Sequence, residues 1–210
     1  MDKEAGDRTF EIWLLGDSNP KQWQSVLSTP LDPRHPARHN IWTPVLDVIQ
    51  DAAFRKSRQR VDTLSLYIRN AIENPDEKPR SNVVEWGPSM TGEIDDLRMS
   101  ISEHHPIVLF SFGAFAFESA RRSQGEEPSR PYSYWGARAL GNEFRKRIEV
   151  FDPTVTNLLP LLHVSISRGR FIQAHEQYCD QAGANYFEFA GTHIADKLLE
   201  HRQALHVWIS

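Results

Sequence analysis

The chain has 210 residues, enough to bury a substantial core, and its length predicts one domain spanning residues 1–210. Hydrophobic residues make up 40% and charged residues 25%, which is ordinary for a globular protein. The single cysteine, Cys179, excludes an internal disulfide framework and a multi-cysteine iron–sulfur site. No apolar run approaches the roughly 18 residues of a membrane span, and the acidic start MDKEAGD is unlike a signal peptide, so we expect a cytoplasmic protein.

The formal net charge of −4 argues mildly against a general nucleic-acid coat protein. It does not exclude an enzyme that acts on DNA, because such an enzyme needs only one basic face. Solvated helix ends are the simpler interpretation of each local basic cluster, and these clusters are Arg34, Arg38 and His39; Arg55, Lys56, Arg58 and Arg60; Arg145, Lys146 and Arg147; and Arg168 and Arg170.

Short apolar runs alternate with helical segments along the chain, which predicts an α/β fold. We expect three α/β/α layers around a central four-stranded, mostly parallel sheet. The predicted strands span residues 9–16, 61–68, 107–112 and 157–165. The run at 107–112 is continuously apolar, as in a strand covered on both faces, whereas Pro160 makes the last strand irregular or places it near an edge.

The predicted helices lie between these strands. Thr43 as a cap and Pro44 at the first helical position open one helix, whose buried stripe comprises Val45, Leu46, Ile49, Ala53 and Phe54. Thr91 is expected to cap a helix over residues 92–104, and further helices are expected over 114–122, 171–182 and 191–203. Residues 73–92 and 123–143 are rich in polar residues, glycine and proline, and they predict long surface loops.

Polar side chains follow each predicted strand. Ligands of open α/β sheets bind beyond the carboxyl ends of the strands, so these side chains predict one shared site. Asp17 and Asn19 are also ordinary turn formers, and a histidine at a strand end often has a structural role. It is the convergence of the whole set that favours a functional site, and the set is Asp17, Ser18, Asn19, Arg69, Asn70, Ser111, Gly113, His163, Ser165 and Ser167.

Other chemistries find less support. A serine hydrolase using Ser18 needs an aspartate and a histidine late in the chain, and the nearest pair, Asp196 and His201, falls on different faces of one predicted helix. Pro36 interrupts the helical spacing of His35 and His39, so we expect no metal site. A glycine loop that cradles phosphate is also absent.

Four blocks follow one another along the chain. They are Gly16-Asp17-Ser18-Asn19-Pro20, Tyr67-Ile68-Arg69-Asn70, Pro106 through Gly113 with Ala116, and His163-Val164-Ser165-Ile166-Ser167-Arg168. In this order they resemble the uracil-DNA glycosylase superfamily, and they are most similar to its bacterial family 4 branch. The first block stands where the family has Gly-Glu-Ala-Pro-Gly, Gly-Gln-Asp-Pro or Gly-x-Asn-Pro. The resemblance covers about 160 residues from Leu14 to Leu199.

The chain also departs from the family pattern. The first block has one extra residue, so Asp17 and Asn19 compete for the catalytic position, and Val164 replaces a proline. The cysteines of the family 4 iron–sulfur cluster are missing, and no cofactor is expected.

The resemblance implies a DNA glycosylase that flips a base out of DNA and hydrolyses its N-glycosidic bond. It implies that Asp17 or Asn19 handles the water, that His163 supports the leaving base, and that Asn70 reads the base edge. Pro20 and an aromatic side chain, Trp42 or Trp23, would complete the base pocket. The implied DNA contacts are Ser111, Gly113, Ser165 and Ser167, with Arg168 or Arg170 filling the gap left by the base.

The substrate stays open between uracil or a damaged base, in DNA repair, and a modified base of phage DNA, in antiviral defence. The altered first block and the inserts at 73–92 and 123–143 favour a base other than plain uracil. The expected partner is single- or double-stranded DNA, with no membrane, and the expected oligomeric state is a monomer. The alternatives are a catalytically inactive DNA-binding module of the same fold and the Ser18 hydrolase.

Overall fold

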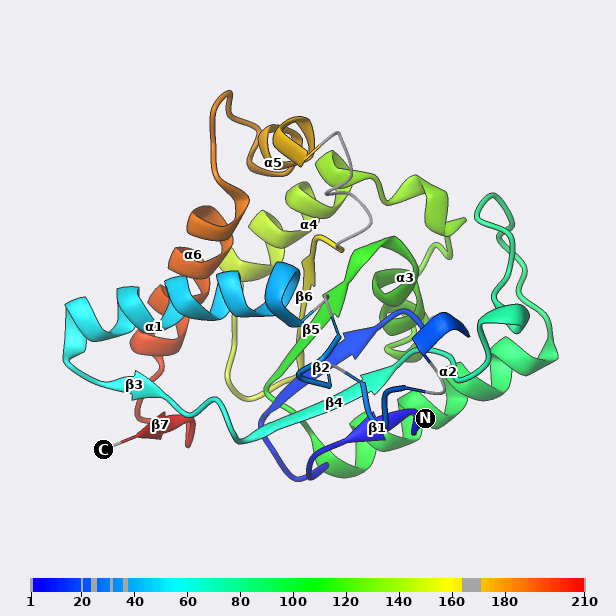
Figure 1. Ribbon diagram of the computed structural model, residues 1–210, viewed down its shortest axis with the longest axis horizontal. Helices are drawn as coiled ribbons and strands as arrows, with labels where there is room; N and C mark the ends of the chain where they lie inside the picture. The colour runs from blue at the N-terminus through cyan, green and yellow to red at the C-terminus, as the bar shows by residue number, and fades with distance from the viewer. Residues whose placement is uncertain are drawn as a thin grey trace.

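A computed structural model describes residues 2–19, 21–23, 26–30, 32–35, 38–163 and 171–209, without the side chain of Trp23. The fold is mixed α/β, with helices on both faces of a central sheet (Figure 1). The predicted three-layer α/β/α class is therefore confirmed. The sheet has five strands, in the order β1 (Glu4–Ala5), β4 (Leu66–Asn70), β2 (Ile12–Gly16), β5 (Val108–Phe112) and β6 (Asn157–Leu161).

All neighbouring strands from β4 to β6 are parallel, and only β1 runs antiparallel, along the outer side of β4. Gly16 pairs with Asn70, Leu15 with Ser111, and Phe112 with Leu161. The four parallel strands therefore end at nearly the same level. The chain leaves β2 toward β4 on one side and leaves β5 toward β6 on the other, so the topological switch point lies between β2 and β5.

The two faces of the sheet follow from the alternation of side chains along each strand. Ile12, Leu66 and Phe110 meet the face covered by α1 (Thr43–Ser57) and α6 (Tyr186–Glu200), which lie side by side. Trp13 and Tyr67 point to the other face, against α2 (Pro88–His104) and α3 (Gly113–Ser123). The remaining helices, α4 (Ala137–Glu149) and α5 (Phe171–Cys179), pack together beside β6.

The predicted strand over 61–68 is split in two. Asp62 accepts hydrogen bonds from the Leu64 amide at 2.8 Å and from the Ser65 hydroxyl at 2.5 Å, which closes a turn in the middle of the run. The part before this turn, β3 (Arg60–Val61), pairs with β7 (Trp208–Ile209) in a separate small sheet. Only the part after it, β4, joins the central sheet.

Helix starts differ from the predicted ones. The loop predicted over 73–92 holds a short 3-10 helix, η3 (Pro75–Glu77), and α2 then begins at Pro88, a proline at the first helical position. The loop predicted over 123–143 ends early, because α4 begins at Ala137 and buries a helical stripe within it. Asn185 caps α6, which starts before the predicted 191.

Helix α1 starts at the predicted position but without the predicted cap. The Thr43 hydroxyl donates to the Arg38 carbonyl at 2.8 Å, and the capping position has no side-chain hydrogen bond. Val45, Ile49 and Ala53 form the buried stripe, whereas Phe54 is exposed.

Strand β6 lies at an edge of the sheet, as Pro160 predicts, and its Pro160 carbonyl accepts the Tyr178 hydroxyl at 2.7 Å. Among the described residues, no helix is both long and apolar enough to cross a membrane.

Candidate active site

The ends of β2 and β4 approach closely because position 16 is glycine. Gly16 lies opposite Asn70, and a Cβ atom on residue 16 would collide with the Asn70 side-chain oxygen. The backbone pairing also continues past the strand ends, since the Ala71 amide donates to the Gly16 carbonyl at 2.9 Å. The glycine therefore lets the Asn70 amide lie over the end of β2.

Asn19 and Asn70 form one buried pair. Asn70 Nδ2 donates to Asn19 Oδ1 at 2.5 Å, and Asn19 Nδ2 donates to the Asp2 carbonyl at 3.3 Å. The backbone N–H of Asn70 donates to the Lys3 carbonyl at 2.9 Å. Both asparagines are buried, so the Asn19 side chain is held between Asn70 and the N-terminal segment.

Asp17 is the accessible carboxylate of the first block. One of its oxygens forms an ion pair with the Lys78 ammonium, and the other accepts the Ser18 hydroxyl at 3.1 Å. About a quarter of each side chain of the ion pair is exposed, 23% for Asp17 and 25% for Lys78. Asp17 therefore offers a negative charge at the strand edge, which the buried Asn19 does not.

His163 follows β6 and lies against the first residue of α3. Gly113 has a φ of +84°, and a Cβ atom there would lie 2.7 Å from the His163 Cβ. Burial lowers the pKa of His163 below its usual 6.5, the Asp17 carboxylate opposes this shift, and the positive charge of Lys78 adds to it. The imidazole is therefore neutral at pH 7.

Lys78 and Tyr132 also belong to this edge, and the sequence did not indicate them. The Lys78 ammonium lies 4.6 Å from the ring centre of Phe115 and 5.2 Å from that of Tyr132. Burial, together with the nearby Asp17 charge, raises the pKa of Tyr132. Both residues come from segments predicted to be surface loops, and the only sequence signal was the presence of these inserts.

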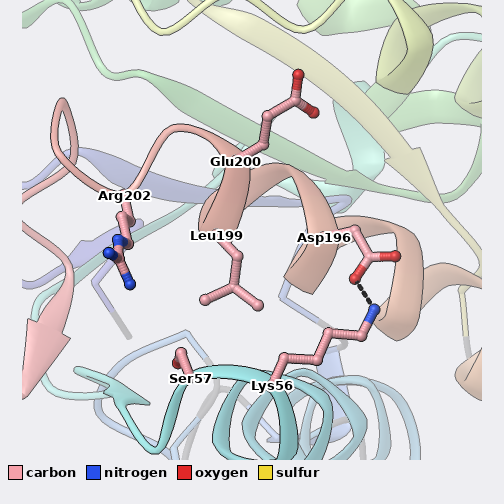
Figure 2. A pocket seen from close by; sticks show the side chains of 6 residues that line it. All are labelled: Lys56, Ser57, Asp196, Leu199, Glu200 and Arg202. Atoms are coloured by element: carbon pink, nitrogen blue, oxygen red, sulfur yellow. Dashed lines mark hydrogen bonds and ion pairs between the residues drawn. The ribbon is translucent and has the colours of Figure 1, made fainter.

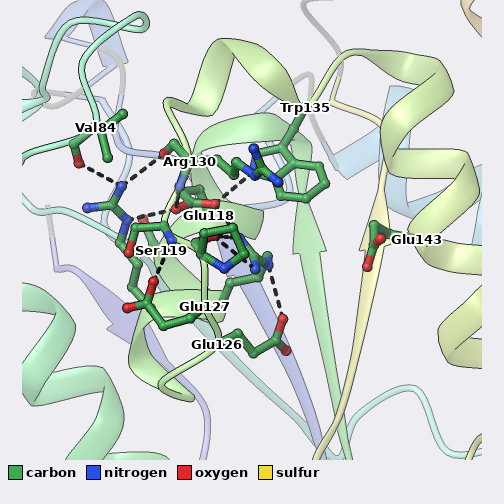
Figure 3. Close-up of polar contacts among 12 residues, drawn as sticks. Val84, Glu118, Ser119, Glu126, Glu127, Arg130, Trp135 and Glu143 are labelled. Carbon is green, nitrogen blue, oxygen red and sulfur yellow. Dashed lines mark hydrogen bonds and ion pairs between the residues drawn. The ribbon is translucent and has the colours of Figure 1, made fainter.

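A buried carboxylate holds the two inserts together (Figure 3). Glu118 of α3 is fully buried and accepts four hydrogen bonds, from Arg121, Arg122, the Arg130 amide and the Trp135 indole, at 2.7–3.0 Å. Arg122 also donates to the carbonyls of Val84, at 2.8 Å, and Arg130, at 2.9 Å. The segments 78–86 and 126–135 are thereby fixed to α3 and to each other.

Several predicted site residues lie in the interior. Trp42 packs in the core against Phe110 and Phe112, with ring centres 5.9 and 6.1 Å apart, and is 6% exposed. Ser111 is fully buried on the α2–α3 face, and among the described residues its hydroxyl has no hydrogen-bond partner. Both side chains lie in the core of the free protein, and the base contact of Trp42 and the DNA contact of Ser111 stay predictions.

Some of the predicted site residues lie outside the described residues. They are Pro20, Ser165, Ser167, Arg168 and Arg170. The side chain of Trp23 is not among the described parts of the chain either.

The basic cluster at residues 55–60 lies far from these strand ends. Lys56 forms an ion pair with Asp196 beside an open hollow of about 360 Å³ between the last turns of α1 and α6 (Figure 2). Arg55 is paired with Asp51. Both charges are matched by neighbouring acids, which fits the interpretation of this cluster as a solvated helix end.

The chain matches no protein-family model and no curated protein. Within the described ranges, no group of three or more histidine, cysteine, aspartate or glutamate residues could hold a metal ion.

Proposed function

We propose that the protein is a DNA glycosylase that hydrolyses the bond between deoxyribose and a base turned out of the DNA. One observation carries the proposal: the carboxyl ends of β2, β4, β5 and β6 bring Asp17, the Asn19–Asn70 pair and His163 to one edge. This edge includes the topological switch point, where ligands of such sheets bind. The same residues carry the sequence resemblance to the uracil-DNA glycosylase superfamily.

The residue types suit this reaction. As the base leaves, the sugar becomes cationic and the base becomes anionic. In the proposed mechanism, the Asp17 carboxylate positions the water and stabilises the cationic sugar, and the neutral His163 donates a hydrogen bond to the leaving base. Burial of Asn19 and exposure of Asp17 favour Asp17 for the water.

Asn70 is proposed to read the edge of the base. One of its N–H groups is held by Asn19, which fixes the plane of the amide. The second N–H group and the carbonyl oxygen then provide a donor and an acceptor for a base edge. In this scheme Asn19 is a positioning residue that acts through Asn70.

The test is formation of abasic sites in oligonucleotides that carry uracil, hypoxanthine or modified cytosines, as single and double strands. His163→Ala should lower the cleavage rate by about 10²–10³-fold, the usual effect of losing one oriented donor. Asp17→Asn should lower it as well, because it removes the charge but keeps the size. Asp152→Asn is a matched control, since the Asp152 side chain closes a turn with Thr154 before β6.

Other outcomes identify the alternatives. DNA binding without abasic sites on any substrate, unchanged in Asp17→Asn, would indicate an inactive binding module. Labelling of Ser18 by a fluorophosphonate would indicate a serine hydrolase, although the Ser18 hydroxyl donates to Asp17. A preference within the panel for uracil and hypoxanthine would favour repair, and a preference for modified cytosines would favour defence against phage.

A further inference from the structure

Lys78 lies at the candidate site with its charge already surrounded by partners. Its ammonium is paired with Asp17 and lies over the rings of Phe115 and Tyr132. An ammonium over aromatic faces is held by the ring quadrupoles while it keeps its positive charge. Its charge also acts on His163, whose pKa it helps to lower. Lys78 therefore places a cation beside the Asp17 carboxylate and close enough to His163 to influence its imidazole.

The segment that carries Lys78 is held by several contacts. The Tyr132 hydroxyl donates to the Pro79 carbonyl at 3.2 Å, and the Ser133 amide donates to the Ser81 carbonyl at 2.9 Å. Trp86 packs on Phe115 with ring centres 5.4 Å apart. The segment that follows Lys78 is thereby tied to residues 132 and 133 and, through Trp86, to Phe115 of α3.

A positive charge on the side of the base would favour the proposed reaction. When the C1′–N bond breaks, its electron pair goes to the base nitrogen. The water oxygen forms the new bond to C1′, and a water proton finally neutralises the departed base. A neutral imidazole offers a hydrogen bond without net charge, and the Asp17 carboxylate repels the base anion. Among the described residues of this edge, the Lys78 ammonium is a group that can balance this charge.

We propose that Lys78 is a catalytic cation that stabilises the negative charge on the departing base, and that it suits the enzyme to bases that are poor leaving groups. This inference rests on the proposed glycosylase function. Bases whose anions are intrinsically unstable gain most from a fixed cation, because more negative charge has to be balanced in the transition state.

The experiment compares single-turnover cleavage of the base excised in the panel with cleavage of its halogenated analogue, such as uracil and 5-fluorouracil. The halogen makes the base a better leaving group. Lys78→Met should lower the rate on the parent base by about 10²-fold and on the halogenated base much less. Lys78→Arg, which keeps the charge, should restore most of the rate on the parent base. Lys21→Met removes a neighbouring exposed lysine paired with Asp76 and should leave both rates unchanged.

The outcomes separate the inference from the function on which it rests. An equal loss on both bases would overturn it, because a lysine that only orients Asp17 or supports the loop would slow every substrate alike. No loss on either base would overturn it too. A wild-type protein that forms no abasic sites would refute the glycosylase function itself. Thermal unfolding of Lys78→Met checks that the variant is folded.

Discussion

Gly113 and His163 belong to different strand ends, yet a Cβ on the glycine would lie 2.7 Å from the Cβ of the histidine. Real Cβ atoms do not approach this closely, so one of the two segments would have to move. The imidazole can therefore keep its position only because residue 113 is a glycine, which has no Cβ atom.

Gly113→Ala should displace His163 and lower the abasic-site rate by about 10²-fold, the scale expected when a catalytic group moves by about 1 Å. It should also destabilise the fold by about 1–2 kcal/mol, because the φ of +84° disfavours alanine. Gly125→Ala provides the matched control, since Gly125 also has a positive φ, +72°, but no neighbouring atom within 4 Å of an added Cβ. It should show the loss of stability without the loss of rate, and equal rate losses would contradict the role of the contact.

Glu118→Gln should destabilise the protein by about 3–5 kcal/mol, because it leaves buried arginines without their carboxylate. Urea unfolding measures this loss. Faster hydrogen exchange of the amides at 126–135 is expected as the inserts loosen. Glu127→Gln, at an exposed turn, should change stability by less than about 0.5 kcal/mol. Similar losses in the two variants would contradict the central role of Glu118.

Deletion of residues 2–5 should destabilise the site and lower the cleavage rate. It removes the carbonyls that accept hydrogen bonds from Asn19 and Asn70, and it removes the Glu4 carboxylate that accepts the buried Tyr67 hydroxyl. The deletion also removes the pairing of β1 with β4 and the ion pairs of Lys3, so the loss in urea unfolding should be several times the roughly 1 kcal/mol of a single hydrogen bond. Lys3→Met removes only the ion pairs of Lys3 with Glu93 and Asp96, so it should keep the cleavage rate. A rate as low as that of the deletion would show that these ion pairs, rather than the backbone, hold the site.

Stability should fall as the pH is lowered from about 7.5 to 5.5. Burial lowers the pKa of both His163 and His175 below 6.5, so the unfolded chain takes up these protons first. The stabilisation is complete at pH values above the pKa of these histidines in the unfolded chain. It is lost as the pH falls through their lower pKa in the folded protein. Urea unfolding at several pH values measures this dependence.

His175→Asn should reduce the pH dependence, because asparagine does not titrate and its oxygen can still accept the Tyr186 amide, as His175 Nδ1 does at 3.2 Å. Replacement of the exposed His105 by asparagine is the control for a histidine outside the core. An unchanged slope in His175→Asn would mean that other groups titrate in this range.

The parallel strands and their ends were predictable because each strand is a short buried apolar run followed by polar residues. Strand β1 was missed because two residues, Glu4 and Ala5, carry no periodicity. The break between β3 and β4 was missed because Asp62 closes its turn with side-chain hydrogen bonds inside an apolar-looking run. The start of α4 was missed because glycine and proline upstream of it indicated a longer loop.

The candidate site was predictable only where it follows the strands. Asp17, Asn19, Asn70 and His163 come together because their strands are parallel and in register. Lys78 reaches Asp17 through tertiary contacts of an insert, which leave no periodic pattern in the sequence. The choice between Asp17 and Asn19 depends on burial and hydrogen bonding, to which a turn sequence gives no access.

The two edges of the central sheet affect how readily the protein aggregates at high concentration. At one edge of the sheet, β4 is covered by β1, a strand of only two residues. Strand β6 forms the other edge and contains Pro160, which lacks an N–H group. The Tyr178 hydroxyl occupies the Pro160 carbonyl, and the Leu162 amide is held by the Tyr186 hydroxyl. Within the part of the chain that the structure describes, these features limit the backbone groups that either edge offers to a second molecule, which disfavours aggregation by strand addition.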